Sequence, residues 1–419
     1  MVVNLEFDFY SQKFINEVLQ LIHMKTLVLT STFPRWKNDT TPSFVYELSS
    51  RLAEKGNKII VLAPHAENSL RHEDIGKVDI HRFRYFYPPK FEKLAYGAGI
   101  IPNFKNSFIA KLNVPFFLLS EYFSAKYLIE KECPNIIHAH WLIPQGIIVA
   151  MLKNKKTKLI VTVHGSDLFP LKNFIFKTLQ RKVLKNADFC TVNSKATENE
   201  IIERFPEYKD KILLIPMGVD IKLFSPRNVK FRQYKNQKII LFVGRLNEQK
   251  GVEYLVKSMP IVNQTIKNAK LLVIGQGDYR NKMQKLANSL NLKNVEFIGS
   301  IPHKNLVDYY NLADVFVLPA VASKIGTEGQ GLVLLEAMAC GTAVIGTDTG
   351  GIKFIVKNNE NGLLVRERDE KHLAENIVKV LSNNKLKEKL IKNGIKFVKN
   401  NYSWNIIVKT FDKLYNELK

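Results

Sequence analysis

The chain has 419 residues, more than one compact hydrophobic core usually accommodates, so two domains are expected. Its hydrophobic fraction of 46% and charged fraction of 24% are typical of a globular protein and exclude a disordered chain. The formal net charge of +23 fits nucleic acid, anionic lipid or phosphorylated substrates as partners, and fits equally a compositional bias towards lysine.

The first 23 residues differ from those that follow. They lack the basic start and the continuous apolar stretch of a secretory signal, since Glu17 and Gln20 interrupt the hydrophobic residues. Met24 directly precedes the first clear strand pattern, so we expect translation to start there and residues 1–23 to be an extension. The alternative is a short amphipathic helix over residues 14–22. No apolar run reaches the roughly 20 residues that a membrane-spanning helix needs.

From Met24 onwards, short apolar runs alternate with helical patterns. Residues 25–30 and 58–63 predict buried parallel strands, and residues 44–55 between them predict an amphipathic helix that ends at Gly56. This βαβ unit is the building block of a doubly wound parallel sheet. Further strands are predicted at 80–83, 136–139, 159–163, 189–192 and 212–215, and helices at 106–132, 145–154, 171–185 and 195–204. Residues 85–106, rich in aromatics, Gly and Pro, predict a long surface loop.

The second half repeats the alternation after a polar linker over residues 218–236, which contains Pro226. Strands are predicted at 238–243, 269–274, 295–298, 315–318, 342–346 and 362–365, and a last helix at 404–418. The fold class is therefore α/β, with two Rossmann-like parallel-sheet domains that face a central cleft. We predict domains at 24–222 and 223–400, followed by a separate helical segment at 401–419.

The motif GRLNEQKG follows the first strand of the second half. Gly244 and Gly251 permit a tight turn and close approach of the backbone to a ligand. Arg245 and Lys250 can face one anion beside a helix N-terminus, an arrangement that suits a diphosphate. A surface loop with ordinary cations is the alternative.

The motif EGQGLVLLE leads into an apolar helix. The sequence predicts that Glu336 lies about two helical turns from Glu328 and faces a similar direction. Both carboxylates could accept hydrogen bonds from sugar hydroxyls, and the apolar surroundings of Glu336 argue that it is hydrogen-bonded. A dipole-complementing Glu328 and a solvated Glu336 are the alternative interpretation.

The motif VTVHGSD ends a strand of the first half. His164 stands where parallel sheets bind ligands and could orient a reacting group, or it could be a satisfied structural histidine. His138 and His140 end the neighbouring strand, but no carboxylate completes a metal-ligand spacing with them, so no metal site is expected.

Weaker signals are the loops at residues 275–278, 299–302 and 350–351. The second of these suits recognition of a base by its backbone, and we expect Ile301 in it to contact the donor. The three cysteines are widely spaced and odd in number, which indicates a reducing, cytoplasmic compartment. The charge is spread over both halves, with +9 in residues 1–225 and +14 in the remainder. Together with the aromatic stretch 85–123, it suggests peripheral association with an anionic membrane at its inner face.

These motifs together resemble the retaining GT-B glycosyltransferases of family four, which include enzymes of polysaccharide and glycolipid synthesis. The resemblance covers residues 25–419 and includes HAHWLIPQG, VTVHGSD, VGRLNEQKG and EGQGLVLLEAMACGTAVIGTDTGGI. It implies that the donor is a nucleoside diphosphate sugar, that no further cofactor takes part, and that the last helix crosses back to the first domain.

The resemblance also implies a role for each candidate residue. Arg245 and Lys250 would grip the donor diphosphate, and Glu336 would bind the ribose. Glu328 and the backbone from Gly329 through Gln330 and Gly331 to Leu332 would contact the donor sugar and phosphate, and His164 would lie at the reacting face of the sugar. The first loop, with Phe33, Arg35 and Thr41, would serve the acceptor.

The expected activity is therefore hexosyl transfer to a hydroxyl of a glycan or lipid-linked glycan, with retention of anomeric configuration and without a metal. A sugar-nucleotide epimerase of the same architecture is the alternative. A basic nucleic-acid-binding protein is the alternative from another class, but the sequence has no aromatic–basic interleaving, so nucleic acid is not an expected partner.

Overall fold

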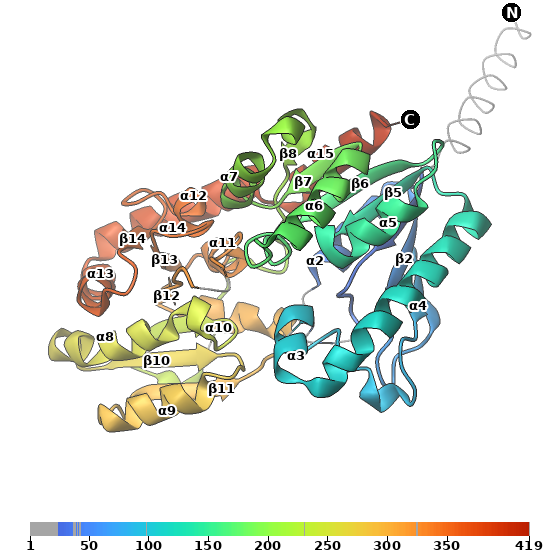
Figure 1. Cartoon of the computed structure of the whole chain (residues 1–419). Coiled ribbons are helices and arrows are strands. Elements are labelled where there is room, and N and C mark those ends of the chain that lie inside the picture. The colour runs from blue at the N-terminus through green and yellow to red at the C-terminus, as the bar shows by residue number, and fades with distance from the viewer. Residues whose placement is uncertain are drawn as a thin grey trace, which may run out of the picture.

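A computed structural model describes residues 24–36, 39, 41, 43–97, 99–229, 231–323 and 326–418. In this part of the chain the strands form two sheets, one of eight strands and one of six, and each sheet is layered between helices (Figure 1). The predicted fold class, two doubly wound α/β domains, is confirmed.

The first sheet has the strand order β3-β4-β2-β1-β5-β6-β7-β8 and is parallel except for the outer β3–β4 pair. Its central strands are continuous apolar runs because helices cover both faces. Strands and helices of this half are β1 (Lys25–Leu29), α2 (Phe44–Glu54), β2 (Lys58–Pro64), β3 (His72–Ile75), β4 (Val78–Phe83), α3 (Ile100–Asn106), α4 (Phe108–Glu132), β5 (Ile136–His140), α5 (Ile147–Leu152), β6 (Lys158–Val163), α6 (Phe174–Asn186), β7 (Phe189–Val192), α7 (Lys195–Arg204) and β8 (Ile212–Leu214).

Alternate residues of these strands enter two separate cores. Leu27 and Leu29 of β1 face the layer of α4, α5 and α6, whereas Val28 faces α2. The period of two along a strand produces this division.

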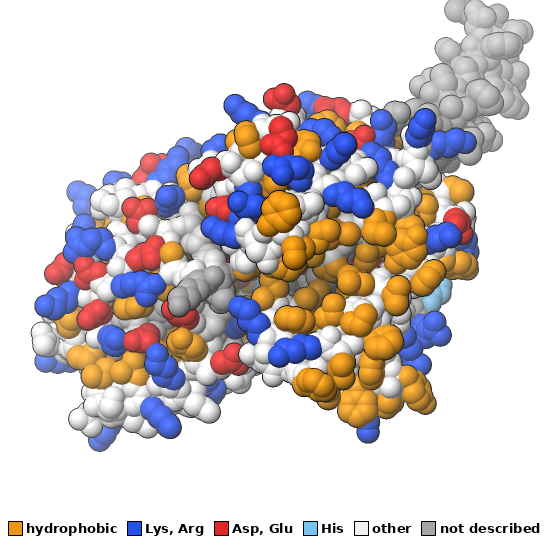
Figure 2. All heavy atoms as spheres, in the orientation of Figure 1, with side chains coloured by type: hydrophobic (Ala, Val, Ile, Leu, Met, Phe, Trp, Pro, Cys, Tyr) orange, Lys and Arg blue, Asp and Glu red, His pale blue; other side chains and the backbone are white. Residues whose placement is uncertain are grey.

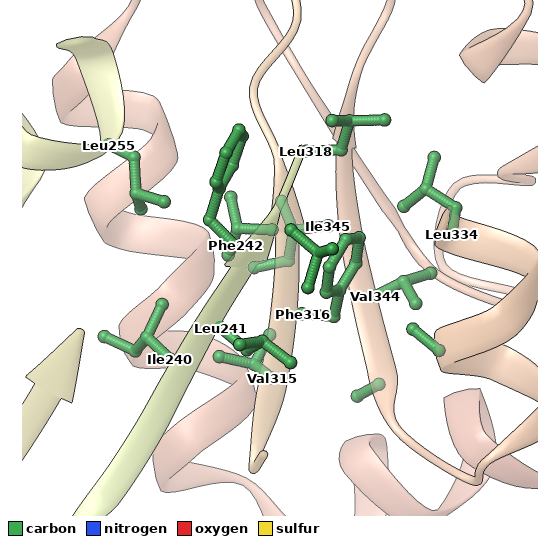
Figure 3. Close-up of a cluster of buried hydrophobic side chains, with 14 of the residues drawn as sticks. Ile240, Leu241, Phe242, Leu255, Val315, Phe316, Leu318, Leu334, Val344 and Ile345 are labelled. Atoms are coloured by element: carbon green, nitrogen blue, oxygen red, sulfur yellow. The ribbon is translucent and has the colours of Figure 1, made fainter. Parts of the chain in front are cut away.

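The second sheet is parallel throughout, with the order β11-β10-β9-β12-β13-β14. Figure 3 shows its core, where Phe242 and Phe316 pack among aliphatic side chains of neighbouring strands and helices. Its elements are β9 (Lys238–Val243), α8 (Val252–Thr265), β10 (Ala269–Ile274), α9 (Arg280–Ser289), β11 (Val295–Gly299), α10 (Leu306–Leu312), β12 (Val315–Leu318), α11 (Leu332–Ala339), β13 (Ala343–Thr347), α12 (Ile352–Ile355), β14 (Leu363–Val365), α13 (Glu370–Ser382) and α14 (Asn384–Asn401).

The chain passes between the two sheets twice, and the two crossings lie side by side. Val219 donates a backbone hydrogen bond of 2.7 Å to Tyr402, and Trp404 donates one of 3.3 Å back to Val219. After the second crossing, helix α15 (Trp404–Asn416) packs against α2 of the first half. The last described helix therefore packs on the first half of the molecule.

Two sequence expectations need correction. The predicted surface loop at 85–106 contains a short helical turn at Pro89–Phe91 and helix α3, and Tyr85 and Tyr96 in it are buried. Strand β3 was not predicted, because its sequence HEDI is polar and lies at the sheet edge, where only one neighbour exists. The expectations for residues 1–23 lie outside the described residues.

No helix in the described part of the chain combines the length and the continuous hydropathy that crossing a bilayer requires.

Candidate active site

The turn after β9 carries the two predicted phosphate-binding cations. Arg245 is the second residue after β9, and Lys250 ends a short helical turn, Glu248–Lys250, that precedes α8. Gly251 begins α8 with a φ of 63°, and a Cβ there would lie 1.9 Å from the carbonyl oxygen of Pro319. Only glycine fits this position, so the turn is held close to the end of β12.

Lys250 is paired with the first of the two predicted carboxylates. Its ammonium group forms a short ion pair with Glu328, and both side chains are largely buried. The other oxygen of Glu328 accepts a hydrogen bond of 3.2 Å from the backbone of Gly331. The structure therefore brings Lys250, Glu328 and the start of α11 together.

The predicted relation between the two carboxylates is wrong in one respect. Helix α11 begins at Leu332, because Gly331 adopts a φ of 77° that ends any earlier helical turn. Glu328 therefore lies in the loop before the helix, and Glu336 lies just over one turn inside it.

Glu336 is buried and hydrogen-bonded, as its apolar neighbours suggested. His303 bonds one carboxylate oxygen at 2.7 Å, and the hydroxyl of Tyr310 donates to the other at 2.8 Å. Burial favours neutral His303, but the charge of Glu336 outweighs this effect and raises the histidine pKa above its usual value. Neither partner was predicted, because they come from the segment that follows β11.

Gly329 and Gln330 connect the two halves of the molecule. A Cβ on Gly329 would lie 3.3 Å from the carbonyl oxygen of His164, so the loop before α11 approaches the loop after β6. The side chain of Gln330 bonds both backbone groups of Met217, at 3.0 and 2.8 Å. The side chain of Gln330 therefore bonds the segment where the chain crosses between the halves, and only the backbone of Gln330 remains for the predicted contact with the donor substrate.

The remaining predicted donor contacts are partly buried. Ile301 packs against the core of the second sheet, and Leu332 contacts the cores of both halves. Gly351 packs against the same loop. A Cβ added at Gly351 would lie 1.8 Å from the carbonyl oxygen of Gly329, and the N–H of Gly351 donates a hydrogen bond to the backbone carbonyl of Glu328. The Gly-Gly pair therefore packs backbone against backbone.

Three neighbouring histidines lie at the ends of β5 and β6, where His138 and His140 are buried and His164 is half-buried. His138 bonds the hydroxyls of Tyr415 at 2.8 Å and Thr162 at 2.6 Å, and its ring stacks on His140. His140 Nδ1 lies 3.0 Å from His164 Nε2. Burial lowers the pKa of His138 and of His164 to about 3, so these rings are neutral at physiological pH.

The partners of His140 determine which nitrogen of His164 carries the proton. His140 Nε2 is buried and has no hydrogen-bond partner among the described residues. An unpaired buried N–H is rarer than an unpaired lone pair, so the proton of His140 belongs on Nδ1 and is donated to His164 Nε2. Neutral His164 then carries its own proton on Nδ1 and can offer it as a hydrogen-bond donor.

Asp167 fixes the loop that holds His164. Its two oxygens accept backbone hydrogen bonds from Leu142 at 2.6 Å and from His164 at 3.1 Å. Burial raises the pKa of Asp167 to about 6, although the backbone donors oppose the shift.

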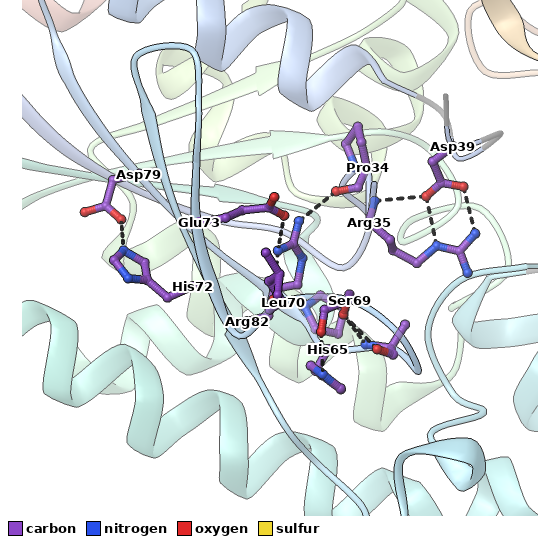
Figure 4. A network of polar contacts seen from close by, with 12 residues as sticks. Pro34, Arg35, Asp39, His65, Ser69, Leu70, His72, Glu73, Asp79 and Arg82 are labelled. Atoms are coloured by element: carbon purple, nitrogen blue, oxygen red, sulfur yellow. Dashed lines mark hydrogen bonds and ion pairs between the residues drawn. The ribbon is translucent and has the colours of Figure 1, made fainter. Parts of the chain in front are cut away.

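The first loop is held by an arginine–aspartate pair. Arg35 donates two side-chain hydrogen bonds to Asp39, at 2.8 and 2.7 Å (Figure 4). Burial opposes ionisation of Asp39, but the bonds from Arg35 prevail and lower the pKa of its carboxyl group to about 2. Thr41 donates its N–H to Asp39, whereas Phe33 is fully buried against Tyr46 and can anchor the loop without contacting an acceptor.

A separate group of possible metal ligands lies on the outer hairpin of the first sheet. His72 and His81 both bond the same oxygen of Asp79, at 2.8 and 3.1 Å. Figure 4 shows His72 and Asp79 on this hairpin. In the described residues, His138, His140 and His164 do not form such a group with a carboxylate.

Two doubly wound α/β domains of this kind form the GT-B architecture. The family model described as glycosyl transferases group 1 matches residues 227–397, and that described as glycosyltransferase family 4 matches residues 42–223. The chain belongs to this family of glycosyltransferases, which transfer a sugar from a nucleotide sugar.

Individual relatives agree with this assignment. An uncharacterized glycosyltransferase of Methanocaldococcus jannaschii, MJ1178, is 30% identical over 84% of this chain and 93% of its own length. A GDP-mannose-dependent monoacylated alpha-(1-6)-phosphatidylinositol monomannoside mannosyltransferase of Corynebacterium glutamicum is 27% identical over 68% of this chain and 76% of its own length.

Solved structures share the fold. Sucrose-phosphate synthase of Thermosynechococcus elongatus has a TM-score of 0.76 at 24% identity, covering 94% of this chain and 99% of that one. Anabaena HepE in complex with UDP-glucose has a TM-score of 0.71 at 16% identity, covering 94% and 100%.

Proposed function

We propose that this chain transfers a hexosyl group from a nucleoside diphosphate sugar to a hydroxyl of a glycan or lipid-linked glycan, with retention of configuration and without a metal. The pair formed by Lys250 and Glu328 at the start of α11 is the observation that carries the proposal. It supports a donor site because the cation, the free backbone amides of the helix and Arg245 could share one diphosphate.

Charge explains how such a site would accelerate the reaction. The diphosphate gains negative charge as the glycosidic bond breaks, and fixed cations stabilise that charge without reorganisation. Arg245 and Lys250 would act in this role, while Glu336 would accept hydrogen bonds from the ribose. Burial lowers the pKa of the Arg245 guanidinium, and the charge of Asp278 opposes this shift.

The first domain would supply the groups on the acceptor side. His164, held neutral and protonated on Nδ1, would donate to a sugar hydroxyl at the reacting face. Arg35 and Thr41 would place the acceptor from the first loop. The Corynebacterium relative is named for an acylated phosphatidylinositol mannoside acceptor, which favours a lipid-linked acceptor here and peripheral work at an anionic membrane.

A donor screen followed by product analysis tests the proposal. UDP-, GDP- and ADP-sugars are compared by thermal shift, and the stabilising donor is incubated with protein while NMR follows the anomeric proton of the released or transferred sugar. We expect a retained anomer and the same rate in the presence of EDTA. An inverted anomer refutes retention, and a rate lost to EDTA and restored by Mn²⁺ refutes metal independence. Conversion of the donor into another sugar nucleotide without an acceptor would favour the epimerase alternative.

A further inference from the structure

Helix α4 carries large apolar side chains on two opposite faces. One face packs on the first sheet through Phe117, Ala125 and Leu128. The other face carries six large apolar side chains, the α4 stripe: Phe108, Leu112, Phe116, Leu119, Phe123 and Tyr127. They recur every three or four residues and so form one line, about 29 Å long at 1.5 Å per residue.

The α4 stripe is open to solvent and free of charge along its centre. Its side chains are between 48% and 74% exposed. Between Leu112 and Ala125 the only charged residue is Glu121, which is buried. An uninterrupted apolar line of this length on a surface indicates an interaction site.

Neighbouring helices widen the apolar surface. Helix α5 packs between α4 and α6, and Met151 at its end is exposed. Phe174 and Ile175 at the start of α6 are 83% and 68% exposed. Figure 2 shows these hydrophobic side chains gathered over α4, α5 and α6, with Lys and Arg around them.

The positive charge of the first half is concentrated in the segment that contains these helices and the loops between them. Residues 99–186 contain thirteen Lys and Arg against four Asp and Glu, a net charge of +9. Residues 1–225 as a whole also carry +9, with 31 basic and 22 acidic residues, so the rest of this half is neutral. The charge is thus spread over both halves of the chain but is uneven within the first half.

We propose that the α4 stripe, together with the exposed residues of α5 and α6, docks this protein on an anionic lipid bilayer. Apolar side chains at the interfacial depth and cations at the headgroups provide the two signals that stable peripheral binding needs. A second copy of this chain is a poorer occupant, since it would bring together two segments that each carry a net charge of +9.

Docking at this surface would place the acceptor loop near the membrane. Helix α3 leads directly into α4, and Asn103 of α3 donates a hydrogen bond of 2.9 Å to the carbonyl of Tyr96. The guanidinium of Arg35 lies 4.9 Å from the ring centroid of Tyr96. Docking would deliver a lipid-linked acceptor to Arg35, and this purpose rests on the proposed function. The docking itself does not depend on the proposed function.

Vesicle flotation without donor or acceptor tests the docking separately from catalysis. The full chain and a chain starting at Met24 are mixed with vesicles of phosphatidylcholine, alone or with phosphatidylglycerol. We expect both chains to float with the anionic vesicles and to be released by high salt. The triple variant Phe108→Ser, Phe116→Ser, Phe123→Ser should bind at least about tenfold more weakly, since it loses three aromatic rings that would be buried in the bilayer.

Leu290→Ser and Ile406→Ser, exposed apolar positions outside these helices, are the matched controls and should bind like the wild type. Circular dichroism and the melting temperature verify that each variant is folded. Absence of flotation, or equal flotation of the triple variant, overturns the proposal. So does a dimer that the triple variant converts into a monomer, which would assign the α4 stripe to self-association. Flotation of the full chain but not of the chain starting at Met24 would assign the docking to residues 1–23 and likewise overturn the proposal.

Discussion

Replacing Lys250 by alanine should separate the structural role of this cation from its role in binding the donor. In the unliganded protein the ammonium of Lys250 neutralises Glu328, and their side chains are only 20% and 11% exposed. The substitution removes a cation from the diphosphate site and simultaneously leaves a buried carboxylate without its partner. Two different losses are therefore expected, one in activity and one in stability.

The structure sets the size of each loss. Removing one preorganised group that stabilises transition-state charge lowers kcat by about 10²- to 10³-fold. Breaking a fully buried ion pair costs about 3–5 kcal/mol, and an exposed pair contributes about 0–1 kcal/mol. The pair of Lys250 and Glu328 lies nearer the buried limit, so we expect about 2–3 kcal/mol, or a melting temperature roughly 4–12 °C lower.

A second substitution distinguishes the two losses. Glu328→Gln removes the orphaned charge and keeps an acceptor for the N–H of Gly331, which lies 3.2 Å from the carboxylate in the native protein. The double variant Lys250→Ala, Glu328→Gln should therefore recover most of the melting temperature. It should still lack the stabilisation by UDP or GDP that binding provides, which differential scanning fluorimetry measures directly.

Two results would contradict this reasoning. Near-normal turnover of Lys250→Ala would remove Lys250 from the diphosphate site. Recovery of nucleotide binding together with stability in the double variant would show that Lys250 serves only to neutralise Glu328.

Three further substitutions test other parts of the structure. Arg245→Lys keeps the charge but loses the planar guanidinium, so kcat/KM should fall roughly tenfold, and equal activity would argue against a direct diphosphate contact. Burial raises the pKa of Glu121 to about 8. The protonated carboxyl group therefore contributes its full stability below the ordinary pKa of glutamate, and this contribution is lost as the pH rises through 8. Glu121→Gln keeps the 2.9 Å bond from Gln145 and should melt higher than wild type near pH 9 but not near pH 4.5, and parallel pH profiles would refute a buried neutral carboxyl. Tyr415→Phe leaves His138 Nδ1 unpaired and should cost about 1–3 kcal/mol in urea unfolding, whereas unchanged stability would show that this bond does not help to dock α15.

The buried strands were predictable because both of their faces are covered, so nearly every residue in them must be apolar. The runs at 238–243, 269–274 and 315–318 coincide with β9, β10 and β12, each covered on both faces by helices. The edge strand β3 escaped prediction because one of its sides faces solvent and its residues are polar.

Residues of the candidate site that are close in sequence could be singled out in advance, whereas contacts between distant elements could not. The loop after β9 drew attention to Arg245 and Lys250 because Gly244 and Gly251 flank a short turn between a strand and a helix. The bonds of Glu336 to His303 and Tyr310 join residues 33 and 26 positions apart, and no spacing rule connects them. The start of α11 was mistaken although Gly331 carried the signal, since a glycine before an apolar helix often marks its first cap.

The paired crossings at Val219 and Tyr402–Trp404 restrict how the two lobes could move. Two hydrogen-bonded segments form a single narrow pivot, and sliding one lobe past the other would break both bonds. The side chain of Gln330 bonds both backbone groups of Met217 and so adds a third connection between the lobes at the same place. Swinging about this pivot would therefore be the least costly motion, and it would change the separation of the lobes most at the points farthest from residue 219.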